Sequence, residues 1–517
     1  MTLFEKLLDY YHITKEDYEE LVKPHTFLDF NDGHEFDNVV EAVNLTRKMM
    51  EKKAKTIIYG DYDCDGIMGV SILKKMFDYL SFPVDYYVPS RYLDGYGINI
   101  NKAKEYVNSG YQFVITVDNG VCANEAIDYL KDNNVTVLVI DHHTPGEVLP
   151  RADVILHPLV SHLGNTTSSG AFSAFMFSRK LLDRVDKYLA TMAAISIVSD
   201  MMPLKEYNRN LLRVVIDTYQ KDEFLPISLL AGDKPFNENT IGMYISPKIN
   251  SIGRVIEDSS INELIKYFTS DDKAFVLSYF NYIVEVSEQR KALSNNAANS
   301  LLDKEYDASI VEYLDIKEGI MGIVANNLLN RYNKPTIIFT KGSEPGVLKG
   351  SARSQEGFNI SEAFHTLDQY LISGGGHANA GGCAIKEENF ELFKEKFNEL
   401  VKNTDIQVKE KEIIPLRLID ISRSNLKLVQ SFSPFGIEWN APTFMIEHID
   451  TSALSYSRNQ LHIITNIGGG SMLRGFNFSR EEVSKNKFIN IYGQLSEDSY
   501  RDLIQTVFDI RKIEKYS

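Results

Sequence analysis

Short apolar runs alternate with longer amphipathic stretches between residues 56 and 160. The runs are rich in β-branched residues and too short to form helices, and they lie at 56–59, 84–88, 113–117 and 135–140. The stretches between them follow the helical period. Strands that alternate with helices in this way are typical of a parallel sheet covered by helices, so we expect an α/β domain here.

Helical patterns flank this region. Residues 1–55 are expected to be mostly helical. Two packed helices are expected between 170 and 200, the first beginning at Gly170 and the second ending just before Asp200. Residues 273–302 form a long helical pattern without Pro or Gly, which predicts a helix that connects two domains.

The second half of the chain predicts two further units. Residues 305–402 show another α/β pattern, with a Gly- and Ser-rich return at 349–354 and a glycine-rich loop at 374–382. Residues 413–517 contain short strand-like pieces separated by turns. This last pattern is typical of a small β barrel.

Composition narrows the class of protein. A chain of 517 residues is too long for one ordinary core, and its 44% hydrophobic and 24% charged residues are typical of a soluble globular protein. Cys64, Cys122 and Cys383 show neither metal-finger spacing nor a disulfide framework, which favours a reducing cytoplasm. We expect no membrane association, because the start of the sequence lacks a secretory pattern and the longest apolar stretch, 189–198, is too short to span a bilayer.

The formal net charge of −16 argues against a protein that coats nucleic acid through its overall electrostatic field. A nuclease remains compatible with this charge. Such an enzyme can hold a phosphodiester through bound metal ions and a few arginines while the rest of its surface is acidic.

Acidic and imidazole side chains follow three of the apolar runs. Asp61, Asp63 and Asp65 follow the first, Asp118 follows the run at 113–117, and an Asp-His-His sequence occupies 141–143. The carboxyl ends of parallel strands meet at one edge of a sheet, and carboxylates gathered there repel one another unless a cation neutralises them. Oxygen ligands with one or two imidazoles favour Mn²⁺ or Mg²⁺, and Zn²⁺ also remains compatible with this set.

Cys64 lies between two of these acids. Alternation along an extended segment is expected to point its side chain away from Asp63 and Asp65.

The motifs and their order resemble the DHH phosphoesterase superfamily, and more closely the RecJ branch of single-strand-specific DNA exonucleases. Its metal-binding motifs are matched by 60–66 (GDYDCDG), 116–120 (TVDNG), 141–146 (DHHTPG) and 199–209. Further matching segments follow in the family's order: 91–97, 247–254, 322–325, 349–354, 374–382 and 434–442. The resemblance covers roughly residue 37 to the C-terminus, and although each motif alone is weak, chance assembly of the ordered set is negligible.

This resemblance implies four parts. They are a DHH catalytic domain with an N-terminal helical segment, a connecting helix, a DHH-associated substrate-binding domain and an OB-like nucleic-acid-binding barrel. Their expected bounds are 1–270, 271–304, 305–402 and 413–517.

In the resembling family the catalytic domain holds two metal ions, usually Mn²⁺, with Mg²⁺ as the alternative. Carried over by motif position, the implied ligands are Asp61, Asp63, Asp65, Asp118, His142 and Asp200. The implied catalytic residues are Asp63, Asp65, Asp118, His142, His143 and Asp200. Asp61 could instead support the metals or cap a helix. Tyr59 stands where some members have a metal-binding His, which predicts weaker affinity at the first metal.

The resemblance also implies a path for nucleic acid. Its expected contacts are Arg91, Asn250, Arg254, Ser351, Arg353, Gly375, Gly376 and His377. Glycine backbone lets amides approach phosphate oxygens closely, and a bidentate arginine can recognise a 5′ end. Arg254 and Arg353 could alternatively be surface ion-pair partners.

From these matches the resemblance implies a metal-dependent exonuclease that degrades single-stranded DNA 5′-to-3′ in repair and recombination. A single-strand-binding protein and a helicase are the implied protein partners. One alternative is a DHH phosphodiesterase for short oligoribonucleotides or cyclic dinucleotides, although the residues after 412 favour long polymers. Another is a non-catalytic nucleic-acid-binding scaffold, against which the complete set of acids argues.

Overall fold

The computed structural model describes the chain except residues 24–25, 28–34, 96, 164–166, 303, 407–411, 501–502 and 517. Its contacts divide the chain into two compact units. One contains residues 30–200 and 218–409, and the other contains 1–29, 201–217 and 410–517. The predicted bounds of the four domains stay a prediction.

The first sheet of the larger unit carries the expected parallel strands. In the order β2-β1-β3-β4-β5, every neighbouring pair is parallel. The strands are β1 (Thr56–Tyr59), β2 (Asp85–Tyr87), β3 (Phe113–Val117), β4 (Thr136–Ile140) and β5 (Val154–Leu156). β1 and β3 are buried throughout, which explains why their sequences are apolar without alternation.

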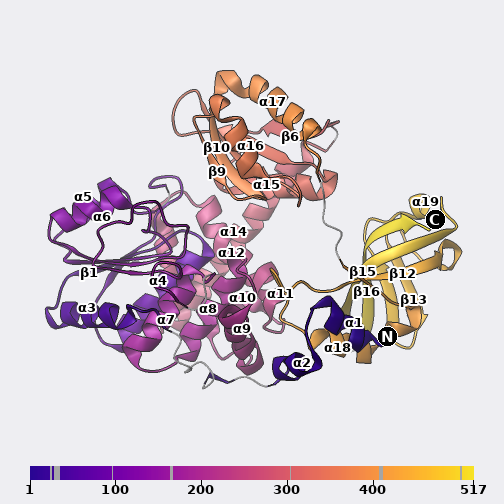
Figure 1. Ribbon diagram of the computed structural model, residues 1–517, viewed down its shortest axis with the longest axis horizontal. Helices are drawn as coiled ribbons and strands as arrows, with labels where there is room; N and C mark the ends of the chain where they lie inside the picture. The colour runs from indigo at the N-terminus through magenta and orange to yellow at the C-terminus, as the bar shows by residue number, and fades with distance from the viewer. Residues whose placement is uncertain are drawn as a thin grey trace. The chain divides into compact units, whose positions relative to one another are not determined.

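Helices cover both faces of this sheet (Figure 1). On one face lie α5 (Ile100–Asn108) and α6 (Asn124–Asp132), whose Tyr106, Ile127 and Leu130 join the core formed by β1, β3 and β4. The other face carries α3 (Val39–Glu51), α4 (Cys64–Tyr79) and α7 (Gly170–Leu182). The predicted α/β layer is confirmed.

A helical layer follows the sheet. Its members are α8 (Lys187–Ser199), α10 (Leu225–Ala231), α11 (Glu238–Thr240), a π-helix (Ile241–Ile245), α12 (Ser246–Val255), α13 (Asn262–Thr269) and α14 (Lys273–Asn299). The predicted helices at 170–200 and 273–302 are confirmed by α7, α8 and α14. α14 packs against α12 and also against α15 (Glu318–Tyr332) of the second α/β layer, as expected for a connecting helix.

The second α/β layer is built on a mixed sheet of order β6-β7-β8-β10-β9. The strands are β6 (Ile310–Tyr313), β7 (Thr336–Lys341), β8 (Val347–Arg353), β9 (Ser373–Gly376) and β10 (Ala380–Lys386). β6 and β7 are parallel, and the other pairs are antiparallel. Two hydrophobic cores flank this sheet. α15 contributes to the core that contains Ile310 and Ile338, and α16 (Ile360–Thr366) and α17 (Phe390–Asn403) contribute to the core that contains Ile337 and Phe339.

The glycine-rich segment at 374–382 is a hairpin, which corrects the expected loop. Gly381 pairs with Gly376, and the amide of His377 donates to the carbonyl of Ala380 over 2.8 Å. Glycine is required at 376, because φ is +139° and a Cβ would lie 2.4 Å from the Ala380 oxygen. The expected return at 349–354 is largely strand as well, since β8 extends to Arg353.

The smaller unit is built on a six-stranded sheet of order β11-β12-β15-β16-β14-β13, consistent with the expected OB-like fold. The strands are β11 (Ile413–Pro415), β12 (Thr443–Asp450), β13 (Ile463–Gly468), β14 (Ser471–Gly475), β15 (Phe488–Tyr500) and β16 (Leu503–Lys515). β15 and β16 have 13 residues each, so the expectation that all the strands are short was wrong.

The same unit includes segments from elsewhere in the chain. Leu7 of α1 (Leu3–Tyr10) is buried in the barrel core, and the Tyr11 ring stacks on Trp439 at 4.4 Å. Arg209 of α9 (Glu206–Thr218) lies 4.4 Å from the Trp439 ring and donates to the carbonyls of Phe432 and Pro434. The remaining helices here are α2 (Lys15–Leu21), α18 (Arg423–Gln430) and α19 (Arg480–Val483).

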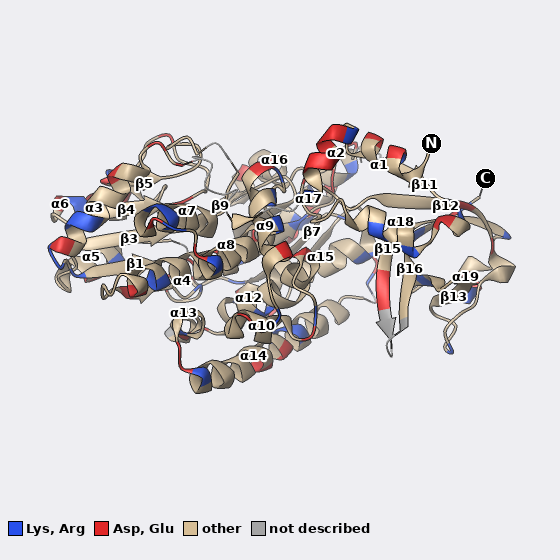
Figure 2. Ribbon diagram, turned by 90° about the horizontal axis from the view of Figure 1, so that it is seen from below, with Lys and Arg blue, Asp and Glu red and all other residues tan. Residues whose placement is uncertain are grey.

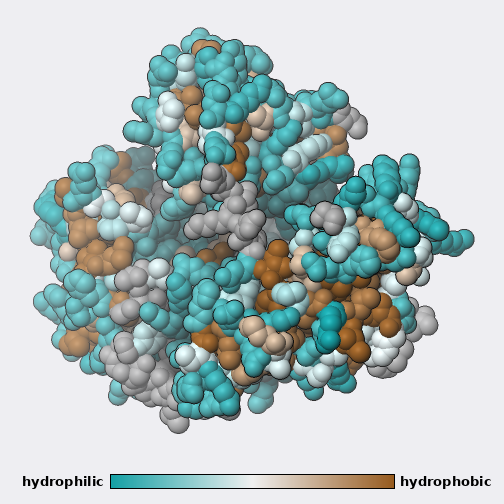
Figure 3. Space-filling model, turned by 45° about the vertical axis from the view of Figure 1, so that its right-hand side comes forward, coloured by the Kyte–Doolittle hydropathy of each residue, from teal (hydrophilic) through white to brown (hydrophobic). Residues whose placement is uncertain are grey.

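The charged residues are interspersed along the helices, with acidic ones gathered on α2 (Figure 2). The face seen in Figure 3 is largely hydrophilic, with hydrophobic residues in patches. Within the described part of the chain, every helix falls short of the length and apolarity needed to cross a bilayer.

Candidate metal centre

Adjacent parallel strands bring the predicted acids together. Tyr59 of β1 pairs with Thr116 of β3, and Thr116 pairs with Val139 of β4, so the three strands end at one level. Asp61, Asp118 and 141–143 therefore leave the sheet at the same edge. Asp200 is the C-cap of α8 and lies 3.6 Å from His142 (Asp200 Oδ2 to His142 Nε2).

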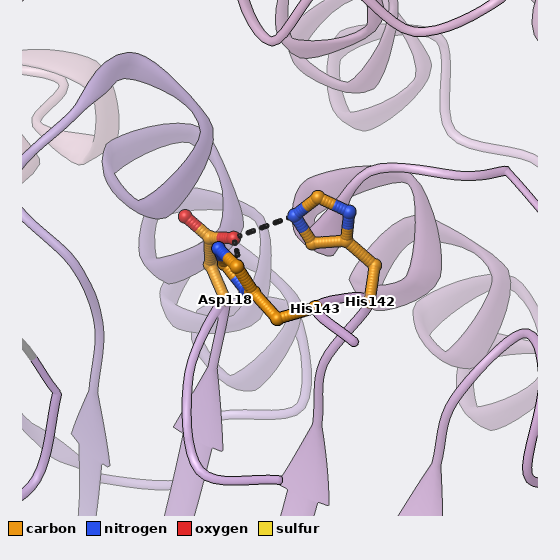
Figure 4. Close-up of side chains that lie close together, drawn as sticks. All are labelled: Asp118, His142 and His143. Carbon is orange, nitrogen blue, oxygen red and sulfur yellow. Dashed lines mark hydrogen bonds and ion pairs between the residues drawn. The ribbon is translucent and has the colours of Figure 1, made fainter. Parts of the chain in front are cut away.

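Among the described residues, three groups of side chains could each hold a metal ion, because their ligand atoms lie within 4.8 Å of one another. The groups are Asp61–Asp63–Asp118, Asp65–His142–Asp200 and Asp118–His142–His143. Asp118 and His142 belong to two groups each, and Figure 4 shows them with His143. All six predicted ligands thus converge, and His143, predicted only as catalytic, joins them.

His142 lies at the centre of this arrangement. Its Nε2 is 3.1 Å from Asp118 Oδ1 and 3.5 Å from Asp65 Oδ2. Only 11% of its side chain is exposed, so its ring faces carboxylates rather than solvent.

Asp118 is held in a strained backbone conformation. Its φ is +61°, in the left-handed region, which costs about 1–2 kcal/mol for a residue with a Cβ. Its amide donates to the Ile140 carbonyl over 2.9 Å. Gly170 leaves the space that Asp118 occupies, because a Cβ at 170 would lie 2.7 Å from the Asp118 Cβ.

Asp65 is fixed by the start of α7. The amides of Gly170 and Ala171 each donate to its carboxylate over 2.8 Å, and Ser196 Oγ donates over 2.6 Å. A helix N-terminus favours a negative charge at this position. These contacts orient the carboxylate before any cation binds.

Asp141 holds the two histidines in place through hydrogen bonds. Its Oδ1 accepts from the His142 amide over 2.7 Å and from His143 Nδ1 over 2.8 Å. Burial acts to raise the pKa of Asp141, but the hydrogen bond and charge of His143 hold that pKa below its ordinary value. Burial likewise acts to lower the pKa of His143, and the bond to Asp141 outweighs it and raises the pKa to about 9. His143 is therefore a cation at neutral pH.

The carboxyls of the centre are difficult to ionise together. Burial and the charge of Asp63 raise the pKa of Asp61 to about 8, and burial and the charge of Asp65 raise the pKa of Asp200 to about 9. Burial, followed by the charges of neighbouring acids, also raises the pKa of Asp63 and of Asp118. The Asp61 Oδ1 is buried without a hydrogen-bond partner among the described residues. A divalent cation would satisfy that oxygen and offset the repulsion, so these residues fit Mn²⁺ or Mg²⁺.

The expected geometry of Cys64 was wrong. Asp63 is the N-cap of α4, accepting from the amides of Asp65 and Gly66, so the chain is helical from Cys64 onward and does not alternate. The Cys64 thiol is buried in the helix, and its amide donates to Asn250 Oδ1 over 2.8 Å. Because Asn250 already makes this bond, its nucleic-acid contact stays a prediction. Asp63, rather than Asp61, is the residue that caps the helix.

Tyr59 provides no ligand to the three groups. Its ring is fully buried in the core beneath α5 and α6, and its hydroxyl donates to the Gly97 carbonyl over 3.0 Å.

A group of arginines lies in the same unit. Burial and then the charges of Arg91, Arg290 and Arg353 lower the pKa of Arg254 to about 10. Among the described residues none of these four forms a salt bridge, so the alternative of surface ion pairs for Arg254 and Arg353 gains no support there. Arg91 lies 4.1 Å from the Tyr62 ring, and its buried Nε has no hydrogen-bond partner among the described residues. Clustered guanidinium groups that form no salt bridge with the acids nearby are suited to bind an anion.

Arg290 was missed in the sequence because its helix was interpreted only as a spacer. It lies on α14, four residues after Val286 and four before Ser294, both of which are buried. This spacing places it on the packed face of the helix. An arginine on a buried face is the feature that could have identified it.

The remaining predicted contacts lie on the second sheet. Arg353 Nη1 donates to the Ala352 carbonyl over 2.7 Å and to Ser351 Oγ over 3.3 Å. Gly375, Gly376 and His377 lie in the exposed hairpin, and none belongs to the three metal-binding groups. Their phosphate contacts stay a prediction.

The raised carboxyl pKa values predict how stability depends on pH. Between about pH 4 and about pH 9 the folded metal-free protein binds more protons than the unfolded chain, whose carboxyls titrate near 3.8. The free energy of unfolding should therefore fall as pH rises through this window. Added Mn²⁺ should raise Tm more at the alkaline end than at the acid end, and EDTA should reverse the gain. Scanning calorimetry checks this, and a metal-free Tm that climbs with pH would contradict it.

The space at Gly170 predicts a second outcome. In Gly170→Ala the new methyl group collides with Asp118, so Mn²⁺ affinity should fall by on the order of 10-fold, with a smaller loss of Tm. Gly242→Ala is the control, because its Cβ would make only an ordinary contact of 3.6 Å with Val198. Titration calorimetry should separate the two, and equal affinities would show that Asp118 does not depend on this contact.

Comparisons with known proteins agree with the fold and the centre. The DHH family, N-terminal domain, matches residues 55–197, and the DHHA1 domain matches 307–403. The chain is similar to the single-stranded-DNA-specific exonuclease RecJ of Bacillus subtilis (strain 168), with 27% identity over 92% of this chain. It spans only 63% of that relative's length. RecJ of Haemophilus influenzae is 28% identical over 84% of this chain and 82% of its own length.

Solved structures show the same fold. RecJ from Thermus thermophilus in complex with Mn²⁺ has a TM-score of 0.82 and 21% identity, covering 99% of this chain and 78% of that one. An exonuclease RecJ bound to manganese has a TM-score of 0.62 and 25% identity, covering 72% and 96%. Ordered motifs, two matching domains and a shared fold lead to one assignment. The chain belongs to the DHH superfamily and is of the RecJ type.

Proposed function

We propose that this chain is a metal-dependent exonuclease that hydrolyses phosphodiester bonds of single-stranded DNA. The observation that carries the proposal is the convergence of buried carboxylates and His142 into overlapping groups that could hold cations. The curated relatives are named single-stranded-DNA-specific exonucleases, which supports the choice of substrate. Structures of relatives with Mn²⁺ and with Mg²⁺ support either ion.

Asp61, Asp63, Asp65, Asp118, His142 and Asp200 are the proposed metal ligands. A pair of divalent ions there would supply Lewis acidity to the scissile phosphate and an activated water at neutral pH. The chain's own contribution is to place these ligands: α7 holds Asp65, and a strained turn holds Asp118.

His143 is the proposed donor to the phosphate. Its Nδ1 is engaged by Asp141, and its side chain is 42% exposed beside the carboxylates. As a cation it can stabilise negative charge on a non-bridging phosphate oxygen.

The arginines support binding of a DNA end. Arg91, Arg254 and Arg353 form no salt bridge among the described residues, and Arg290 adds a fourth positive charge near Arg254. We propose that this group receives the 5′ terminus, which accounts for 5′-to-3′ degradation, and that Asn250, Ser351 and 375–377 line the path behind it.

The wider role is carried by the RecJ resemblance. We propose DNA repair and recombination in the cytoplasm, with a single-strand-binding protein and a helicase as partners, and strand binding by the OB-like part. We also propose the domain bounds 1–270, 271–304, 305–402 and 413–517, with the added contacts of α1 and α9 to the barrel.

Removing one central carboxylate tests the catalytic assignment. Asp118→Asn should abolish hydrolysis of end-labelled single-stranded DNA with Mn²⁺ while the far-ultraviolet circular dichroism stays unchanged, because Asp118 belongs to two metal-binding groups. Asp132→Asn, an exposed acid at the end of α6, is the matched control and should stay active. Duplex DNA, RNA and cyclic dinucleotides assayed in parallel separate the DNA exonuclease from other DHH phosphodiesterases. Near-normal turnover in Asp118→Asn would remove the assignment.

The arginine group predicts a preference for a phosphorylated end. Arg353→Gln should lower kcat/KM on 5′-phosphorylated strands by on the order of 10-fold and reduce the preference over 5′-hydroxyl strands, because a charge-assisted bidentate contact is lost. Arg331→Gln, in the last turn of α15, should change neither value. If Arg353→Gln slows both substrates equally, the residue does not recognise the 5′ phosphate.

A further inference from the structure

His157 lies directly behind the histidines of the centre. It follows β5, whose Leu156 pairs with Ile140 of β4, and the Asp141 amide donates to the Leu156 carbonyl over 3.1 Å. The two strands therefore deliver His157 and 141–143 side by side. His157 has no exposed surface and belongs to none of the metal-binding groups.

The hydrogen bonds of His157 define its tautomer. Its Nε2 lies 2.7 Å from the His143 carbonyl oxygen, which can only accept, so Nε2 carries the proton. Its Nδ1 accepts from the Leu159 amide over 3.1 Å and is therefore unprotonated. The ring is neutral and uses both nitrogens, one toward the centre and one toward its own loop.

The loop of His157 is closed on itself. The His157 amide donates to Ser161 Oγ over 3.2 Å, and the Ser161 amide donates to the His157 carbonyl over 2.8 Å. Ser161 Oγ in turn donates to the Ile155 carbonyl. These bonds anchor the ring to the edge of the sheet.

His143 is consequently held from two sides. Asp141 accepts from its amide and from its ring, and His157 donates to its carbonyl. With its amide and its carbonyl both engaged, the two peptide planes that flank His143 have little freedom to rotate. The His142 and His143 side chains project from this fixed stretch of backbone.

We propose that His157 is a positioning residue, whose single hydrogen bond to the His143 carbonyl sets the histidine ligand geometry of the metal centre. The inference rests on the proposed function, because it assumes that the centre binds metal. Supports of this kind behind metal ligands typically change metal affinity or activity by about 10- to 100-fold when removed. Nothing in the motif order predicts it, because His157 lies outside every sequence motif that carries the resemblance.

Two substitutions separate the roles of the two ring nitrogens. In His157→Gln the side-chain Nε2 can still donate to the His143 carbonyl, but the Leu159 amide loses its acceptor. In His157→Asn the amide oxygen can still accept from Leu159, but no donor reaches His143. A residue that only anchors its loop would tolerate Asn better than Gln. The proposal predicts the opposite order.

The experiment measures Mn²⁺ binding by titration calorimetry in the full chain without DNA, and then kcat and KM on single-stranded DNA. His157→Asn should weaken Mn²⁺ binding and lower kcat, each by on the order of 10-fold, with KM for DNA unchanged. His157→Gln should stay close to wild type in all three values. His162→Gln is the control, because that side chain is 77% exposed and pairs with Asp37 at the surface.

The outcomes separate this inference from the proposed function. If His157→Asn binds Mn²⁺ with wild-type affinity, or if both variants lose Mn²⁺ affinity equally, the positioning role alone is overturned. A wild-type chain that binds no Mn²⁺ would overturn the proposed function and this inference with it. Thermal melting shows whether each variant is folded, and if His157→Asn does not fold, His157→Gln decides: retained affinity supports the proposal and lost affinity overturns it.

Discussion

Electrostatic repulsion among buried carboxylates governs how the metal centre and the elements around it are built. Asp61, Asp63, Asp118 and Asp200 all have a pKa raised first by burial, and each sits within the field of other acids. A protein gains no stability from such an arrangement by itself. Divalent cations that neutralise the carboxylates would explain the cluster. Its place at the carboxyl edge of a parallel sheet is where such sheets bind ligands.

The surrounding elements oppose this repulsion in different ways. The first amides of α7 and Ser196 hold the Asp65 carboxylate, so part of its charge is compensated by the protein. The buried Asp141 pairs with the partly exposed His143, which adds a positive charge beside the acids. Asp118 is kept in a left-handed conformation, and it occupies space that a side chain at position 170 would fill. Strain and charge are thus concentrated at the site, as is common where function requires them.

The parallel sheet and the convergence of the acids at its edge could be predicted because both depend on local sequence. Buried β-branched runs mark the strands, and Asp61, Asp118 and Asp141 follow where their strands end. Cys64 shows the limit of this approach: alternation holds only while the chain is extended, and Asp63 starts a helix at that point. The hairpin at 374–382 was missed for a similar reason, since glycines are poor strand formers and only pairing with β8 and β10 makes them strand.

Other features depend on contacts between distant segments, which periodicity does not report. The packing of Leu7, Tyr11 and Arg209 against the barrel joins residues that lie far apart in the sequence. Arg290 and His157 belong to this class as well: each looks ordinary in the sequence, and its role depends on the groups that it faces in the fold.

Locating bound manganese tests directly whether the clustered carboxylates and His142 form a metal centre. Crystals soaked in Mn²⁺ and measured near the manganese absorption edge should show anomalous peaks among Asp61, Asp63, Asp65, Asp118, His142 and Asp200, with Asp118 close to more than one ion. An empty pocket, with these side chains turned away from one another, would contradict the central claim.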